Sequence, residues 1–250
     1  MAPIEVERTD GRATVTLNRP EKLNALTGEM FATIEDVFTE FAADVPDVVT
    51  VRGAGEHFSA GVDMAGVPEW AEQTPREVRD QLEGVHDALR AMEDLDAPIV
   101  AAIQGNCLGG GLELTLACDV RIATETATFG LPESNMGLAM DLGGAQKLPG
   151  FVGEGLTKYM IMTGRNIDAD RALQAGLVEE VHDPAAFEAA VADLEDVLAE
   201  KPTYVHGFAK RQVHSARPLN LDEAMQQAIY HAISGYNEPE TLDRVEEFLE

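Results

Sequence analysis

Hydrophobic and polar residues follow two different periods along the first two thirds of the chain. Alternating or continuously apolar positions, typical of strands, are found at 4–8, 13–18, 48–52, 98–103 and 120–123. The first two of these segments flank Asp10-Gly11, a turn sequence that predicts a β-hairpin. Apolar residues at helical spacing follow Thr27, a suitable N-cap, and recur over 78–92. A further short helix is expected from about Gly110, after a glycine-rich turn.

The last third of the chain is almost wholly helical. From about residue 153 onward the apolar spacing is that of helices, apart from a short strand expected at 177–181. The final helices are expected over 221–233 and 241–249. Strands first and helices last predict an α/β core with a helical extension. We therefore divide the chain into a core of residues 1–195 and a helical region of residues 196–250.

Composition places the chain among folded proteins with a sizeable core. It has 250 residues, of which 45% are hydrophobic, without the run of about 18 apolar residues that a membrane span needs. The N-terminus lacks a signal-peptide pattern, which favours a cytoplasmic protein. Cys107 and Cys118 have no second pair of ligands nearby in the sequence, so buried free thiols are expected and no metal site.

The charge is strongly one-sided. Asp and Glu number 45 against 18 Lys and Arg, which gives a formal net charge of −27. A nucleic-acid partner is excluded, because binding the phosphate backbone needs a basic face. The acids are spread along the whole chain and so belong to the surface of a folded domain. Such a surface repels itself in dilute salt and is screened in concentrated salt, which predicts a protein of a salt-rich cytosol.

We expect the protein to unfold at a higher temperature in about 2 M KCl than at about 50 mM salt, because the screening length falls to about 3 Å near 1 M. Thermal unfolding followed by circular dichroism at the two concentrations tests this expectation. Equal or higher stability in dilute salt would contradict the salt-rich interpretation.

Three glycine- or turn-rich segments follow the strands, at 53–63, 105–113 and 129–133. Neither a dinucleotide nor a P-loop pattern can be drawn through their glycines, and Ser59 is one residue short of a nucleophile elbow. Gly109-Gly110-Gly111 could instead bare N–H groups at a helix start, with a second donor from the 60–63 turn completing an oxyanion hole. Glu113 and Glu133 could then act as acid and base. The spacing alone is equally consistent with a structural alternative, in which the glycines allow close packing and both glutamates are solvated.

The motifs taken together resemble the enoyl-CoA hydratase/isomerase, or crotonase, family. They cover nearly the whole chain in the order that family shows: Asn18-Arg19-Pro20, Asn24-Ala25-Leu26, Ala60-Gly61-Val62-Asp63, Gly109-Gly110-Gly111-x-Glu113, Ala117-Cys118-Asp119, Phe129-Gly130-Leu131-Pro132-Glu133, Thr163-Gly164 and Ala175-Gly176-Leu177-Val178. The resemblance implies an α/β fold with a crotonase-like ββα spiral core and a C-terminal helical trimerisation region. It also implies a homotrimer or hexamer acting on acyl-CoA thioesters, with no cofactor besides the coenzyme A of the substrate.

The resemblance also assigns roles to individual residues. The N–H groups of Val62 and Gly110 match the oxyanion hole, and Glu113 and Glu133 match the two carboxylates of the hydratases. The remaining matches are to the part of the site that binds the substrate and its coenzyme A: Ala60 toward the adenine, Leu23 and Phe58 beside the pantetheine arm, and Gly109.

Asp141 departs from the hydratase pattern, which has a glycine at this position. An Asp eight residues after a Glu resembles the dienoyl-CoA isomerase branch, although that branch usually has Asp at the position of Glu113. Related haloaroyl-CoA dehalogenases have a nucleophilic Asp here but lack a Glu like Glu133. Capping of a helix beginning near Leu142 is the local structural alternative. We therefore expect hydration of a 2-enoyl-CoA, with double-bond isomerisation by Glu133 and Asp141 as the alternative and a non-catalytic acyl-CoA-binding scaffold as the third reading.

The other polar residues carry weaker expectations. Arg19, Lys22 and Lys210 are the basic residues expected near the entrance for coenzyme A. The histidines without metal-binding spacing are interpreted as structural: His86, His182, His206, His214 and His231. Trp70 lies in the 68–75 segment, which is interpreted either as a flap over the acyl chain or as a packed loop.

Overall fold

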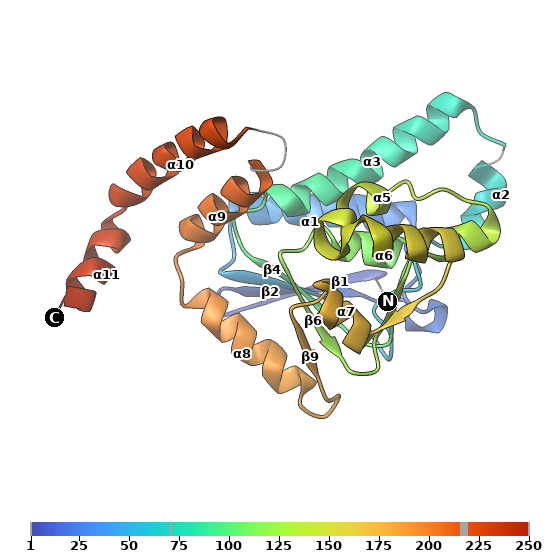
Figure 1. Ribbon diagram of the computed structural model, residues 1–250, viewed down its shortest axis with the longest axis horizontal. Coiled ribbons are helices and arrows are strands. Elements are labelled where there is room, and N and C mark those ends of the chain that lie inside the picture. Colours follow the sequence, from blue (N-terminus) through green and yellow to red (C-terminus); the bar gives the residue numbers. More distant parts are fainter. Residues whose placement is uncertain (1, 71, 216–219, 250) are drawn as a thin grey trace.

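The computed structural model describes residues 2–70, 72–215 and 220–249 (Figure 1). Its main sheet has six strands in the order β1-β2-β3-β4-β6-β9. The hairpin β1–β2 is antiparallel and every later pairing is parallel. The strand bounds are Ile4–Thr9, Arg12–Leu17, Val48–Gly53, Ile99–Ile103, Val120–Thr124 and Glu180–His182. The five strands expected before residue 150 are thereby confirmed.

A second, three-stranded sheet was not expected from the sequence. It consists of β5 (Asn106–Leu108), β7 (Thr128–Gly130) and β8 (Ile167–Asp168), in the order β5-β7-β8. Strands of two or three residues are too short to show a hydrophobic period. Because β5 leads into the glycine-rich turn at Gly109, this small sheet sets the position of the predicted helix start.

Helices cover both faces of the main sheet (Figure 1). On one face α8 (Phe187–Ala199) packs Phe187 and Val191 into a small cluster with sheet residues Val48, Val100, Ala102 and Ile122. The larger core lies on the other face, beneath α1 (Gly28–Ala43), α3 (Pro75–Asp94), α4 (Gly110–Thr115) and α6 (Pro149–Thr163). The shorter helices are α2 (Val67–Trp70), α5 (Gly144–Lys147) and α7 (Ala169–Ala175).

The helix starts follow the capping chemistry of the sequence. Thr27 accepts a hydrogen bond from the N–H of Met30 at 3.3 Å, as predicted for α1. Helix α3 begins earlier than the apolar spacing indicates, because Thr74 and Glu77 form a capping box ahead of Val78. None of the helices within the described residues has the length and hydrophobicity that a membrane span requires.

Two boundaries differ from the prediction. Leu177 and Val178 are buried but precede the strand, and β9 spans only Glu180–His182, where the chain pairs with β6. The apolar pair Leu177-Val178 is therefore buried outside the strand, and the strand forms only where the chain pairs with β6. The expected division after residue 195 falls inside α8, which stays on the sheet until Ala199.

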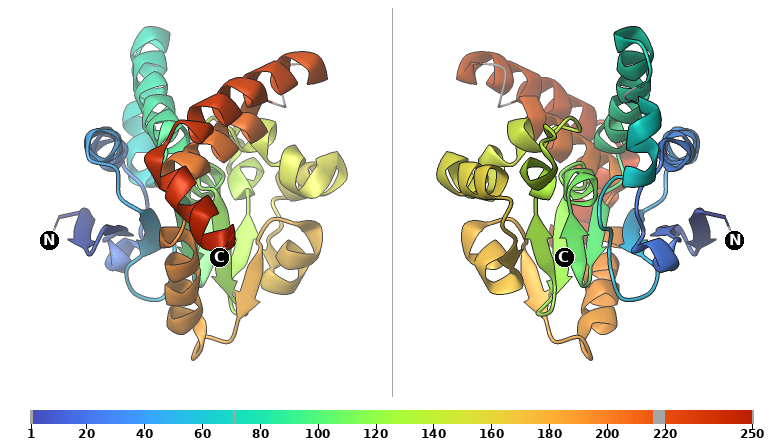
Figure 2. Two further views of the ribbon diagram at one scale, coloured as in Figure 1. Left: turned by 90° about the vertical axis from the view of Figure 1, so that its left-hand side faces the viewer. Right: turned by 90° about the vertical axis from the view of Figure 1, so that its right-hand side faces the viewer.

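The C-terminal region consists of the helices α9 (Thr203–Ser215), α10 (Leu221–Tyr236) and α11 (Pro239–Leu249), which confirms the expected helical region. Helices α10 and α11 extend away from the sheet and its core (Figure 1), and they lie in front of it in the left view of Figure 2. Helix α10 packs mainly against α9 and α11.

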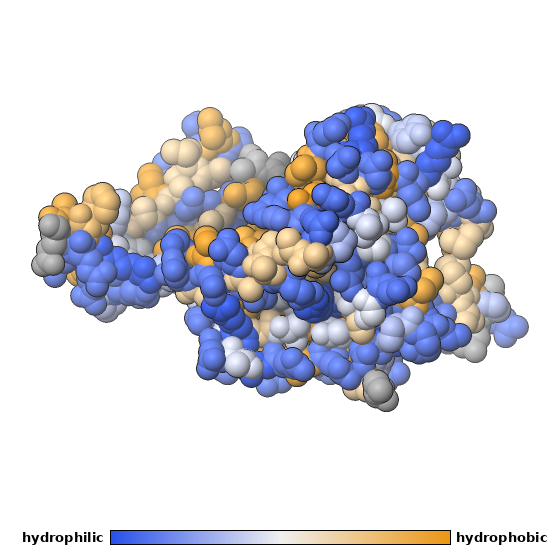
Figure 3. Space-filling view, turned by 90° about the horizontal axis from the view of Figure 1, so that it is seen from below, coloured by the Kyte–Doolittle hydropathy of each residue, from blue (hydrophilic) through white to orange (hydrophobic). Residues whose placement is uncertain are grey.

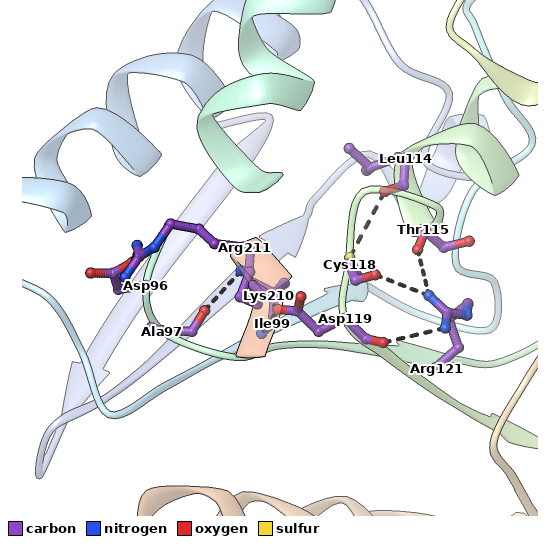
Figure 4. A network of polar contacts seen from close by, with 10 residues as sticks. All are labelled: Asp96, Ala97, Ile99, Leu114, Thr115, Cys118, Asp119, Arg121, Lys210 and Arg211. Atoms are coloured by element: carbon purple, nitrogen blue, oxygen red, sulfur yellow. Dashed lines mark hydrogen bonds and ion pairs between the residues drawn. The ribbon is translucent and has the colours of Figure 1, made fainter. Parts of the chain in front are cut away.

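A buried polar network ties α9 to the core (Figure 4). The Lys210 Nζ lies 2.9 Å from Asp119 Oδ2 and donates to the Ala97 carbonyl at 3.1 Å. Asp119 Oδ2 also accepts from the Ile99 N–H at 2.8 Å. Lys210 was expected near the coenzyme A entrance, and that expectation is wrong, because its side chain is only 9% exposed and is occupied by this network.

We expect Lys210→Met to lower the free energy of unfolding by about 2 kcal/mol. Breaking a fully buried ion pair costs about 3–5 kcal/mol, and Asp119 offsets part of this through Ile99 and its remaining solvent contact. Urea unfolding of the two proteins measures the difference. Lys158→Met removes an exposed i,i+4 pair with Glu154 and is the matched control, expected to leave stability unchanged. Equal stability of Lys210→Met and the wild type would contradict the network's role.

Candidate active site

A cavity of about 620 Å³ lies between α1, α3, the start of α4 and the 132–142 segment. All three predicted carboxylates line it: Glu113, Glu133 and Asp141. Most of the remaining wall is apolar and includes Leu26 and Phe31. Three acids separated in sequence therefore share one largely apolar chamber, the kind of environment in which carboxyl pKa values rise.

The start of α4 presents the predicted glycine turn to this cavity. Gly109 has φ +51° and ψ −129°, a conformation suited to glycine, and its N–H donates to the Gly130 carbonyl at 2.9 Å. A Cβ at Gly109 would lie 2.8 Å from Glu133 Oε1, so only glycine admits that carboxylate here. Gly110 is the first residue of the helix, and its N–H has no intrahelical acceptor.

The second predicted donor, the N–H of Val62, lies beside Gly110. The Cβ position of Gly110 is 3.5 Å from the Val62 nitrogen. Val62 follows Gly61, which has φ +99°. In the described part of the chain neither N–H makes a loop or cap hydrogen bond to the backbone. Two adjacent unoccupied donors at a cavity wall are the arrangement that an oxyanion needs.

Ser59 shapes this donor turn from within the core. Its hydroxyl donates to the Asn24 carbonyl at 2.8 Å and accepts from the Gly61 N–H at 3.1 Å. Asn24, also completely buried, donates to the carbonyls of Ala54 and His57. Ser59 is therefore a structural residue rather than a nucleophile, as the sequence indicates.

Glu113 is the most deeply buried of the three carboxylates. Its side chain is 2% exposed, and Oε1 accepts the Gly144 N–H at 2.7 Å. Burial, reinforced by the charges of Glu133 and Asp141, raises its pKa to about 7, although the backbone hydrogen bond opposes the shift. A carboxyl with this pKa can both give and take a proton near neutral pH.

Glu133 lies on a short 3₁₀ helix, Pro132–Met136, across from Gly109. Its Oε2 is buried, and within the described residues no group donates a hydrogen bond to it. Burial, and after it the charge of Asp141, raises the pKa of this carboxyl. A buried carboxylate oxygen without a donor calls for a water or a ligand group that donates a hydrogen bond to it.

Asp141 lies in the loop before α5 and does not cap that helix. Gly143 is the N-cap residue, and no side chain makes a capping bond there. Desolvation raises the pKa of Asp141, and the nearby His86 opposes the rise. The Asp141 backbone carbonyl lies 2.6 Å from His86 Nε2. The charge of Asp141 in turn reaches both glutamates, so the three acids interact.

The residues predicted to contact coenzyme A differ in where they lie in the structure. Ala60 lines the cavity, and its N–H donates to the carbonyl of Leu23, which is 44% exposed beside it. Phe58 does not fit the predicted contact with a pantetheine arm, because its side chain is completely buried in the core. Burial of this aromatic ring supports the loop from beneath.

The other residues named from the sequence fall on the rim and wall. Arg19 pairs with Asp63 at 2.9 Å and donates to the Ala25 carbonyl, which orders the turn around Val62. Trp70 lines the cavity as part of α2. Cys107 and Cys118 are buried free thiols, as expected.

His86 is the site residue that the sequence interpretation overlooked. It continues the row Val78–Leu82 at four-residue spacing, and both of those residues line the cavity. That row was a usable signal, because residues four apart share one helix face. The row could not show that the backbone of Asp141 lies within hydrogen-bond distance of His86.

The chain is similar to known proteins over nearly all of its length. The sequence pattern of the enoyl-CoA hydratase/isomerase family matches residues 7–248. The chain is 30% identical to 4-chlorobenzoyl coenzyme A dehalogenase-1 of Arthrobacter sp over 98% of its own length and 90% of the relative. It is 33% identical to the mitochondrial Delta(3,5)-Delta(2,4)-dienoyl-CoA isomerase of Mus musculus, over 84% of this chain and 68% of the isomerase.

The fold is similar as well. The crystal structure of an enoyl-CoA hydratase from Thermoplasma volcanium GSS1 superposes with a TM-score of 0.91, at 33% identity, and covers 99% of this chain and 97% of that one. The expected crotonase-like α/β fold is thereby confirmed. Relatives at this level of identity include a hydratase, an isomerase and a dehalogenase, so similarity alone does not select one reaction. With the match spanning almost its entire length, the chain belongs to the enoyl-CoA hydratase/isomerase family.

Proposed function

We propose that this protein is an enoyl-CoA hydratase that adds water to the double bond of a 2-enoyl-CoA thioester. The observation that carries the proposal is the buried Oε2 of Glu133, to which no group within the described residues donates a hydrogen bond. Glu133 lines the same cavity as Glu113, Val62 and Gly110. Two carboxyl groups facing a polarised thioester are what hydration requires. Coenzyme A enters as part of the substrate, and no further cofactor takes part in these steps.

The proposed chemistry follows from the geometry. The thioester oxygen accepts hydrogen bonds from Val62 and Gly110, which draws electrons from the double bond and makes C3 electrophilic. One glutamate takes a proton from water as the water oxygen bonds to C3. The negative charge moves to the thioester oxygen as an enolate, and the other glutamate protonates C2. The product is a 3-hydroxyacyl-CoA, and the atoms added are those of one water.

Double-bond isomerisation is the second candidate, and the placement of Asp141 favours it. Asp141 lines the same cavity as Glu133, and its charge contributes to the raised pKa of that glutamate. One of the two would remove a proton from one end of a conjugated dienoyl system, and the other would return a proton at the far end. The oxyanion hole would hold the dienolate between these transfers.

A substrate panel in concentrated salt separates these candidates. We expect purified protein to hydrate crotonyl-CoA, with the activity lost in Glu133→Gln and lowered about tenfold or more in Asp141→Asn, because the charge of Asp141 acts on both glutamates. Conversion of 3,5-dienoyl-CoA that requires both residues would favour the isomerase. Chloride release from 4-chlorobenzoyl-CoA, or binding of all thioesters without turnover, would contradict both.

We further propose that the C-terminal helices join copies of this chain into a homotrimer or hexamer. Helix α10 exposes an apolar row at three- to four-residue spacing: Leu221, Met225, Ile229, Ile233 and Tyr236. Figure 3 shows apolar residues along the extension that carries α10 and α11. An apolar face of this kind calls for a partner surface. Sedimentation in high salt tests the proposal, and a monomeric wild type would contradict it.

The cavity wall also predicts which acyl chains are accepted. Gly84 of α3 lines the cavity, and a Cβ built there meets no atom within 4 Å. We expect Gly84→Leu to fill space that an acyl chain would use, equivalent to about three methylenes at 0.8 kcal/mol each. The ratio of kcat/KM for a long-chain 2-enoyl-CoA to that for crotonyl-CoA should fall by about 60-fold.

Gly155→Leu serves as the control for this substitution. Gly155 lies on α6 outside the cavity, and a Cβ there also meets no atom within 4 Å. It should leave the chain-length ratio unchanged. An unchanged ratio in Gly84→Leu would show that the acyl chain does not run along α3.

A further inference from the structure

A side chain from the opposite wall contacts the loop that carries Asp141, and the Glu113 carboxyl accepts a hydrogen bond from the next residue, Leu142. His86 of α3 places Nε2 2.6 Å from the Asp141 carbonyl oxygen. Residues 138–141 have no regular secondary structure. Within the described residues, His86 is the only side chain from another element that hydrogen-bonds the backbone of residues 139–141. The position of the Asp141 carboxylate thus depends on a bond made from α3.

The hydrogen bond identifies which ring nitrogen carries a proton. A carbonyl oxygen only accepts, so Nε2 must donate. The bond therefore forms with the neutral Nε2–H tautomer and with the protonated ring alike. Protonation adds a second effect, since the charged ring favours the ionised form of Asp141.

Charged groups surround this contact on several elements. On α3, Asp87 pairs with Arg90 at 2.5 Å, and Glu83 is exposed nearby in the sequence. Across the cavity are Glu133 and the deeper Glu113. His86 thus contacts the backbone of Asp141, while the titratable side chains that line the cavity are acids.

We propose that His86 is a positioning residue, which holds Asp141 in its working orientation by donating a hydrogen bond to its backbone carbonyl. The same helix supplies Val78, Leu82 and Val85 to the cavity wall. His86 therefore links the wall that would contact the acyl chain to the loop that carries the third carboxylate. This inference rests on the proposed function only in so far as Asp141 takes part in the reaction.

The test compares His86→Leu with His86→Gln on the thioester that the wild type converts. Leucine removes the donor, whereas glutamine keeps an N–H near the position of Nε2 without a ring charge. We expect His86→Leu to lower kcat by about 10- to 100-fold with KM nearly unchanged, because small displacements of a reacting group have effects of this size. His86→Gln should stay within about threefold of the wild type at neutral pH.

His206 provides a matched control. Its Nε2 lies 3.0 Å from the Leu198 carbonyl, a bond of the same kind made away from the cavity. His206→Leu is expected to change the melting temperature but not kcat. A structural role alone for His86 would make the His86→Leu and His206→Leu variants behave alike, and would overturn the proposal.

Two further measurements connect the effect to Asp141. In the Asp141→Asn background, His86→Leu should cause no additional loss of kcat, since a positioning residue has nothing left to position. Amide hydrogen exchange over residues 138–142 should be faster in His86→Leu than in the wild type and in His86→Gln. Independent, additive losses of kcat or unchanged exchange would overturn the proposal.

These outcomes keep the inference apart from the proposed function. If the wild type converts no thioester, the proposed function fails, and the exchange measurement still decides whether His86 holds the loop. If the wild type is active and Asp141→Asn is impaired while His86→Leu is not, the positioning role alone fails. Should His86→Leu not fold, His86→Gln decides, because a loss of kcat as large as that of Asp141→Asn would contradict the proposal.

Discussion

Replacing Glu113 by glutamine is expected to lower kcat by about 10²- to 10⁴-fold, the usual contribution of a general acid or base. Glutamine keeps the Oε1 acceptor for the Gly144 N–H, so the local structure should persist while proton transfer is lost. The cavity is shared by three carboxyl groups, but Glu113 alone is almost fully shielded from solvent and has a pKa near 7. Steady-state hydration of crotonyl-CoA measures the loss.

Glu154→Gln is the control for this prediction. Glu154 is an exposed acid on α6 that pairs with Lys158, and its replacement should leave kcat unchanged. KM of Glu113→Gln should change little, because the thioester oxygen is bound by backbone N–H groups rather than by this side chain. Retention of full activity would remove Glu113 from the reaction and with it the proposed hydration step.

The same substitution is expected to stabilise the protein at high pH. The pKa of Glu113 rises from 4.5 to about 7 on folding, so the folded state binds a proton that the unfolded state has released in this window. Below about pH 4.5, Glu113 is protonated in both states and does not lower the free energy of unfolding. As the pH rises from about 4.5 through about 7, Glu113 lowers the free energy of unfolding progressively. At 1.36 kcal/mol per pH unit, the penalty at pH 8 is about 3 kcal/mol.

Urea unfolding of the wild type and Glu113→Gln across this range measures the effect. The two proteins should have similar stability near pH 5, and the variant should be more stable by about 3 kcal/mol near pH 8. Other groups, such as Asp63 and Glu188 with their lowered pKa values, are common to both proteins and cancel in the difference. A difference that does not change with pH would show that Glu113 titrates normally in the folded protein.

Features that depend on neighbouring residues were predicted from the sequence, and features that depend on distant residues were not. Thr27 predicted the start of α1 correctly, because capping depends on residues three positions apart. The strand expected at 177–181 was misplaced, since buried apolar residues occur in turns as well as in strands. The sheet of β5, β7 and β8 was not seen at all, because its strands acquire their character only by pairing.

Side-chain roles divide in the same way. Phe58 and Lys210 were both expected at the substrate, and the structure buries the first in the core and uses the second to anchor α9. Neither outcome can be read from spacing, because the partners of Lys210 are Ala97 and Asp119 on distant parts of the chain. His86 was interpreted as structural because the residue that it contacts, Asp141, lies 55 residues further along the chain.

The sequence by itself indicated the family, the α/β order of elements, the glycine turn at Gly109 and the three carboxylates as candidate site residues. These features are carried by short motifs and local capping, whose physics involves neighbouring residues. Only the tertiary structure decided that Glu113, Glu133 and Asp141 share one largely apolar chamber. Their proton affinities follow from that shared burial and mutual repulsion, which are properties of the folded packing rather than of any segment.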